Sequence, residues 1–141
     1  METKAYWVGF NLVKGIGAVR LKQILDFFGS LEVAWYSPAE GFISAGIPQK
    51  IIENLMKIRS QVDLNRIMDN IAQKKIRVIT WQDPDYPRRL KEINQSPPVL
   101  YINGNINVED EWAVAVVGTR RVTTYGRMVA MELAGFLARN G

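Results

Sequence analysis

The sequence contains no cysteine and no histidine. Without cysteine there are no disulfides and no thiolate metal sites, which fits a reducing cytoplasm. Without histidine the chain lacks the commonest general base and the commonest zinc ligand. Catalytic triads that use histidine and zinc-dependent hydrolysis are therefore excluded, and we expect neither a metal nor another cofactor.

Long apolar runs are also missing. No stretch approaches the roughly 18–20 apolar residues of a membrane-spanning helix, and residues 1–4 lead into a mixed aromatic segment that does not resemble a signal peptide. We therefore expect a cytoplasmic protein that does not bind membranes. The 141 residues include 18 Lys and Arg and 14 Asp and Glu, a formal charge of +4. This mild excess permits an anionic partner without requiring one.

The first 62 residues show the apolar spacing of helices. Tyr6, Phe10 and Val13 lie at i, i+4 and i+7, and residues 21–28 and 51–58 follow the same rule. Two short turns separate these segments: Lys-Gly-Ile-Gly at residues 14–17 and Ala-Gly-Ile-Pro at residues 45–48. In each turn the isoleucine is expected to enter the core. The pattern predicts two helix–turn–helix units in one all-α module.

Both turns resemble helix–hairpin–helix elements, in which backbone N–H groups at a helix N-terminus hold a DNA phosphate. Lys14, Gly15 and Gly17 are the candidate phosphate contacts. The alternative is a bundle similar to the sterile alpha motif (SAM), whose glycines are structural and whose surface binds protein. Residues 1–62 carry seven basic and five acidic side chains, which does not decide between the two.

After residue 62 the pattern becomes mixed. Helices are expected at residues 62–75 and 125–139, and strands at residues 76–81, 99–102 and 113–117. The last of these runs is almost wholly apolar, as in a parallel strand covered on both faces. Because at least one more parallel strand should follow, we expect this α/β domain to be truncated.

The expected fold class is therefore α/β with an N-terminal all-α module. Residues 1–62 are predicted to form a helix–hairpin–helix or SAM-like bundle. Residues 63–141 are predicted to form the first part of an extended Rossmann-like domain with a parallel sheet.

The end of the third expected strand is the main candidate site. Gly118 follows the strand and precedes a helix, a position where backbone N–H groups and the helix dipole favour a phosphate. The candidate nucleic-acid contacts are Gly118, Thr119, Arg120, Arg121, Gly126 and Arg127. Residues 112–141 hold four arginines and one glutamate, so the local charge favours an anion over a plain chain turn with solvated arginines. Neither GxGxxG nor GxxxxGK[ST] is present, so dinucleotide binding and ATP hydrolysis are not indicated.

Three motifs occur in order along the second half: DPDYPRRL at residues 83–90, SPPVLY at 96–101 followed by Gly104, and VGTR at 117–120. Together with the Gly-Ile-Gly turn near the start, they resemble the DNA-processing protein A (DprA/Smf) family over essentially the whole chain. The paired prolines force extended backbone and remove hydrogen-bond donors. We interpret the proline motifs as structural braces.

The resemblance implies a bacterial cytoplasmic protein without catalytic activity. It implies sequence-independent binding of single-stranded DNA and loading of the RecA recombinase in natural transformation and recombination, by a homodimer in the full-length protein. The resemblance implies that the arginine of the VGTR motif contacts DNA, and in this chain that arginine is Arg120. Gly118 and Thr119 lie beside it in the motif. The family's Rossmann-like domain continues beyond residue 141. We therefore expect this chain to contain part of the DNA site, to bind DNA with reduced affinity and not to load the recombinase.

Two other functions remain open. Nucleotide phosphoribohydrolases of the lysine-decarboxylase-like type use a similar strand–Gly-x-Arg turn for a nucleotide phosphate, although their P-G-G-x-G-T-x-x-E motif does not occur in these residues. A free-standing helix–hairpin–helix adaptor for duplex DNA or protein is the third possibility. It would not depend on Arg120.

Overall fold

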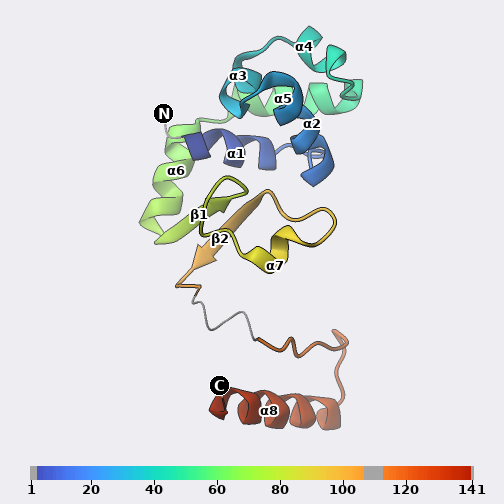
Figure 1. Ribbon diagram of the computed structural model, residues 1–141, viewed down its shortest axis with the longest axis vertical. Helices are drawn as coiled ribbons and strands as arrows, with labels where there is room; N and C mark the ends of the chain where they lie inside the picture. The colour runs from blue at the N-terminus through green and yellow to red at the C-terminus, as the bar shows by residue number, and fades with distance from the viewer. Residues whose placement is uncertain (1–2, 107–112, 141) are drawn as a thin grey trace. The chain divides into compact units, whose positions relative to one another are not determined.

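The computed structural model describes residues 3–106 and 113–140. The chain divides into two compact units, Met1–Asn105 and Ile106–Gly141. In the first unit the chain passes from a helical bundle into a β-hairpin (Figure 1). The domain boundary expected at residues 62 and 63 stays a prediction.

The first unit begins with six helices. They are α1 (Thr3–Asn11), α2 (Ala18–Phe28), α3 (Leu31–Tyr36), α4 (Ala39–Ser44), α5 (Gln49–Gln61) and α6 (Leu64–Gln73). The N-terminal part of the chain is therefore helical, as expected. Helix α3 is an addition to it, and it begins where the Ser30 hydroxyl accepts a hydrogen bond from the backbone N–H of Val33.

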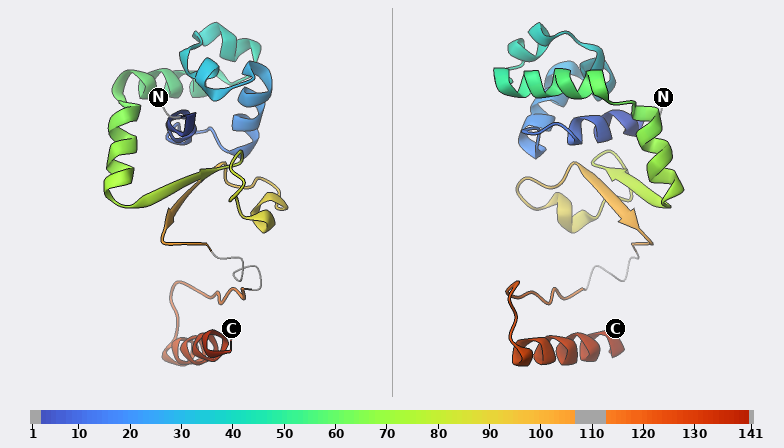
Figure 2. Two further views of the ribbon diagram at one scale, coloured as in Figure 1. Left: turned by 60° about the vertical axis from the view of Figure 1, so that its left-hand side comes forward. Right: turned by 180° about the vertical axis from the view of Figure 1, so that it is seen from behind.

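Helix α1 lies between the other helices and the hairpin (Figures 1 and 2). Its residues from Ala5 to Phe10 are all buried. Phe10 packs edge-on against Trp35 of α3 with ring centroids 5.3 Å apart, while Trp7 packs edge-on against Trp81 beyond the first strand at 5.9 Å. The helices and the hairpin therefore share one apolar core.

The hairpin consists of β1 (Ile76–Thr80) and β2 (Val99–Asn103), with the short helix α7 (Arg88–Lys91) in the connection. The strands pair antiparallel, from Ile76 opposite Asn103 to Thr80 opposite Val99. Two of the expected strands are thus present. Val78 and Val99 direct their side chains into the shared core.

The second unit corrects the expectation of a third strand. Residues 113–119 do not form a strand, and in helix α8 (Thr124–Arg139) no residue is buried, so Val129, Leu133 and Phe136 are exposed. A strand needs a neighbour to pair its backbone N–H and C=O groups, and the described part of this unit offers none. The described residues therefore contain a small antiparallel sheet and show no Rossmann-like parallel sheet.

Candidate nucleic-acid interface

The VGTR turn is open along its whole length. Gly118, Thr119, Arg120 and Arg121 are all exposed, and a Cβ added at Gly118 would meet no atom within 4 Å. The Thr119 hydroxyl accepts a hydrogen bond of 3.3 Å from the backbone N–H of Arg121 and so holds the turn locally. The turn presents two adjacent guanidinium groups to solvent.

Helix α8 follows this turn directly. Thr123 caps it, because its hydroxyl accepts a hydrogen bond of 3.1 Å from the backbone N–H of Gly126. A Cβ at Gly126 would lie 2.9 Å from Cγ2 of Val122, so glycine fits the close return of the chain there. Thr123 was missed as a site residue in the sequence, although threonine before a helical run is a recognised start signal.

The arginines near the turn are available for an anion. Arg120, Arg121 and Arg127 are exposed and form no ion pair with any residue that the structure describes. A guanidinium carries five N–H donors in a planar fork that matches a phosphate. All six candidate residues therefore lie between the VGTR turn and the first turn of α8. This stretch has a surplus of positive charge.

The first helix–hairpin–helix turn lies in the other unit. Gly15 has φ 101°, a conformation that favours glycine, and a Cβ there would lie 3.0 Å from Cγ1 of Ile51. Ile16 is buried, as expected. Gly17 is extended, with φ −104°, and precedes α2, whose first N–H groups receive no side-chain cap. These N–H groups therefore have no side-chain acceptor at the start of α2.

Neighbouring side chains hold this turn in place. The Arg20 guanidinium donates a hydrogen bond of 2.8 Å to the carbonyl oxygen of Gly15, and the Asn54 amide donates one of 3.0 Å to the carbonyl oxygen of Lys14. The Lys14 side chain itself is exposed. The turn is therefore preorganised, with Lys14 free to reach an anion.

The second turn has the same construction. Gly46 has φ 75° and Ile47 is buried. The Gln23 side chain of α2 donates a hydrogen bond of 2.7 Å to the carbonyl oxygen of Ala45, so α2 contacts both turns. Helix α5 then starts after Pro48 without a side-chain cap. The repeated layout seen in the sequence is thus repeated in backbone geometry.

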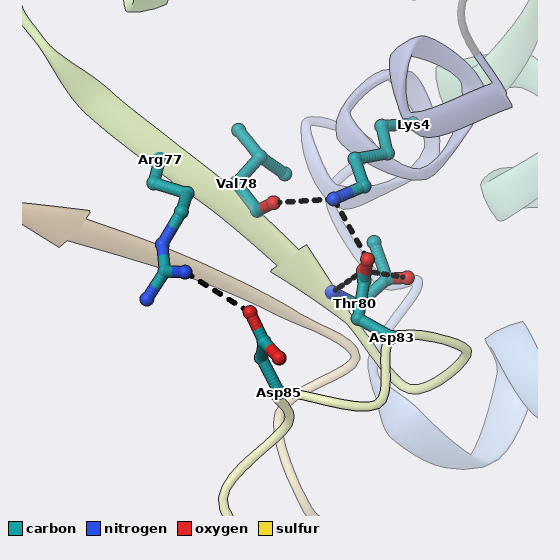
Figure 3. Close-up of polar contacts among 6 residues, drawn as sticks. All are labelled: Lys4, Arg77, Val78, Thr80, Asp83 and Asp85. Atoms are coloured by element: carbon teal, nitrogen blue, oxygen red, sulfur yellow. Dashed lines mark hydrogen bonds and ion pairs between the residues drawn. The ribbon is translucent and has the colours of Figure 1, made fainter. Parts of the chain in front are cut away.

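The first residue of the DPDYPRRL motif joins the hairpin to α1 (Figure 3). The Asp83 carboxylate accepts hydrogen bonds from the backbone N–H of Thr80 at 2.7 Å and from its hydroxyl at 2.8 Å, and forms an ion pair of 2.8 Å with Lys4. Lys4 also donates a hydrogen bond of 3.0 Å to the carbonyl oxygen of Val78. Burial alone would raise the pKa of Asp83, but the hydrogen bonds from Lys4 and Thr80 outweigh it and lower the pKa.

The tyrosine of the same motif connects it to the next one. Tyr86 is buried, and its hydroxyl donates a hydrogen bond of 2.7 Å to the carbonyl oxygen of Pro97. Pro97 has no N–H to take part in a strand ladder, and it stands just before β2. Asp83 and Tyr86 therefore fix the path of the chain between the two strands and carry no exposed reactive group.

The family model for DNA recombination-mediator protein A matches residues 77–141. Protein Smf of Synechocystis sp. is 34% identical over 98% of this chain. The chain belongs to the DprA/Smf family. DNA processing protein DprA of Bacillus subtilis is a more distant relative, 24% identical over 86% of the chain.

The DprA/Smf match covers both proline motifs and the VGTR turn, which all lie within residues 77–141. The chain spans 36% of the length of Smf and 44% of the length of DprA. No solved structure gave a significant match. In the described residues no helix is long and apolar enough to cross a membrane, and no cluster of three or more potential metal-binding side chains occurs.

Proposed function

We propose that this DprA/Smf chain acts in DNA processing by binding single-stranded DNA without sequence preference, with Arg120 as the principal phosphate contact. The observation that supports this is the exposed VGTR turn, which lies inside the segment matched by the recombination-mediator family. Three arginines without an acidic partner in the described residues surround it. Contacts of this kind go to the phosphate backbone, which has the same chemistry at every base.

Each candidate residue has a distinct part in this proposal. Arg120 and Arg121 contact phosphate oxygens, and Arg127 adds charge from the first turns of α8. Gly118 leaves room for the backbone of the strand, and Thr119 fixes the turn. Gly126 permits the tight entry into α8. A strand held by guanidinium groups alone should bind with strong salt dependence.

The helix–hairpin–helix turn is a second proposed contact. Lys14 is exposed beside the uncapped start of α2, and Gly15 and Gly17 leave its backbone N–H groups unobstructed. A phosphate there would accept hydrogen bonds from these N–H groups. The alternative is that the same bundle binds a protein. Weaker DNA binding by Lys14→Gln would favour the phosphate contact over this alternative.

The wider role follows from the family. We propose that the full-length protein works in the cytoplasm in natural transformation and recombination, as a homodimer that loads RecA onto single strands and catalyses no reaction. In this proposal residues 63–141 form part of a Rossmann-like domain. The present chain would contribute part of the DNA site.

The proposal is tested by fluorescence anisotropy with labelled single-stranded and duplex oligonucleotides over a range of salt concentrations. We expect Arg120→Ala to weaken single-strand binding by about tenfold or more and to lower the salt dependence by about one phosphate contact. Arg139→Ala is the matched control, because it removes the same charge at the other end of α8, roughly 20 Å away along the helix. Single-strand binding that is unchanged in Arg120→Ala would contradict the proposal.

A further inference from the structure

The outward side of α2 carries an exposed apolar stripe. Val19 and Phe27 lie eight positions apart on one face of the helix and are 63% and 52% exposed. They line a hollow of about 570 Å³ between α2 and the end of α4. Ile43 of α4, which directly precedes the lining residue Ser44, is 57% exposed. Single exposed apolar side chains are ordinary on a protein surface, but several of them around one hollow indicate a contact surface.

The charge around this hollow is negative. Residues 23–49 contain three acidic side chains and no lysine or arginine, in a chain whose formal charge is +4. Asp26 lines the hollow, and Glu40 lies four positions before the lining residue Ser44, on the same face of α4. Lys22 also lines the hollow, but its ion pair with Asp26 is more than 60% exposed on both sides and contributes little. Such a surface repels phosphate and favours a partner with basic and apolar side chains.

The first unit itself carries a basic surface with an apolar residue. Helix α7 has the sequence Arg-Arg-Leu-Lys, and the exposed contact of Arg88 with Glu92 is 3.6 Å long. The Lys91 ammonium lies 5.7 Å from the centre of the Tyr86 ring, a contact that positions the charge without neutralising it. Ile93 follows this helix and is 50% exposed. The α7 segment therefore has the chemistry that the hollow on α2 favours.

Lys22 connects the acidic and the basic surface. It lines the hollow beside Asp26 and also a second hollow, of about 290 Å³, which Lys91 lines. The chain between α7 and β2 passes beside the first turns of α2 (Figures 1 and 2). Asp26 and Lys91 therefore flank Lys22 on one surface of the first unit and have opposite charges. A twofold axis through such a surface brings the acidic part of each copy onto the basic part of the other.

We propose that two copies of this chain associate through this surface as a symmetric dimer, in which Asp26 of each copy pairs with Lys91 of the other. The α7 segment and Ile93 of one copy cover Val19 and Phe27 of the other. Because the contact is self-complementary, both charge pairs form together. The proposal goes beyond the proposed DNA binding, since it uses none of residues 118–127. It holds for the 141-residue chain itself.

Sedimentation equilibrium of the 141-residue chain over a range of concentrations tests the proposal. We expect a monomer–dimer equilibrium for the unmodified chain. Asp26→Lys and Lys91→Glu should each weaken association by about tenfold or more, because each change places like charges opposite one another. An equimolar mixture of the two variants should restore the dimer, because the changed charges then face opposite charges in both halves of the interface. Restoration also shows that each variant is folded.

Two exposed residues of α5 provide matched controls. Glu53→Lys and Lys57→Glu make the same charge changes, and neither residue lines either hollow. We expect both variants to associate like the unmodified chain. An unmodified chain that stays monomeric at about 1 mM would overturn the inference. Association that neither Asp26→Lys nor Lys91→Glu weakens, or that the mixture does not restore, would overturn it as well.

Arg120→Ala separates this surface from the VGTR turn. We expect it to weaken strand binding, measured by anisotropy, and to leave association unchanged. If Arg120→Ala weakens strand binding while the unmodified chain is monomeric, the dimer surface is excluded and the proposed DNA contact stands. If association follows the charge changes while Arg120→Ala has no effect on strand binding, the proposed DNA contact fails and the dimer surface stands.

Discussion

Gly15 and Gly17 stand two residues apart in one turn, yet their backbones impose different requirements. At Gly15, φ is 101° and a new Cβ would press against Ile51, whereas at Gly17 the backbone is extended and a Cβ would meet nothing within 4 Å. We expect Gly15→Ala to lower the free energy of unfolding by about 1–2 kcal/mol. Gly17→Ala should change it by about 0.5 kcal/mol or less. Urea denaturation of both variants checks this, and equal losses would contradict it.

The lowered pKa of Asp83 makes the stability of the chain depend on pH. Its folded pKa lies below the unfolded value of about 3.9, so protons bind more strongly to the unfolded chain and stability falls as pH decreases. The stabilisation is fully present above roughly pH 4 and is lost as pH falls through the lowered pKa. Asp83→Asn should therefore cost about 1 kcal/mol at neutral pH and less than that at about pH 3.

Asp85→Asn is the matched control for this experiment. Asp85 belongs to the same motif, but its ion pair with Arg77 is exposed on both sides, at 45% and 62%. We expect its removal to cost about 0.5 kcal/mol or less at any pH. Denaturant unfolding at both pH values compares the two variants, and a cost for Asp83→Asn that does not decrease in acid would show that its charge has no part in the effect.

At the scale of single residues, the sequence predicted local features but did not predict contacts between distant positions. It predicted that the isoleucines of both turns would be buried, because each is the apolar residue between the turn residues. It did not predict the Lys4–Asp83 pair, whose members are 79 positions apart and meet only after the hairpin packs against α1. Nor did it predict the unpaired Trp81 donor, since a hydrogen-bond partner cannot be read from spacing.

The proline motifs matter as elements that guide the chain between β1 and β2. Tyr86→Phe removes the donor to the carbonyl oxygen of Pro97 while keeping the buried ring. We expect the free energy of unfolding to fall by about 1–2 kcal/mol. Tyr101→Phe is the control, because the Tyr101 hydroxyl accepts only an exposed hydrogen bond of 3.4 Å from Asn11. Thermal unfolding of the two variants measures the difference, and equal midpoints would show that the brace is not stabilising.

Helix positions were predictable because apolar spacing and turn residues act within a few positions of each other. The strands β1 and β2 were predictable as strands for the same reason. Their antiparallel pairing was not, because direction is set by the partner and by the α7 connection. The expected third strand failed for a related reason: residues 113–117 are apolar enough for a strand, but the described second unit supplies no neighbour to pair with them.

Over the whole molecule, the buried core and the principal proposed DNA contact, Arg120, lie in different units. All the buried apolar residues of the described chain lie between Ala5 and Val99, while Arg120 and α8 lie beyond residue 105. Within the described residues, the buried apolar core is therefore made by the first unit.

A chain ending at Ile106 should accordingly keep the full stability of the first unit. We expect its thermal unfolding to be cooperative and its free energy of unfolding to match that of the 141-residue chain within about 0.5 kcal/mol, because none of the removed residues that the structure describes is buried. A chain ending at Lys75 is the control. It lacks Val78, Val99 and the ring of Trp81 that packs on Trp7, so it should unfold at a clearly lower temperature. Calorimetry distinguishes the three chains. If removal of residues 107–141 destabilised the first unit as much as removal of the hairpin does, the two units would share a core and the separation of stability from strand binding would be wrong.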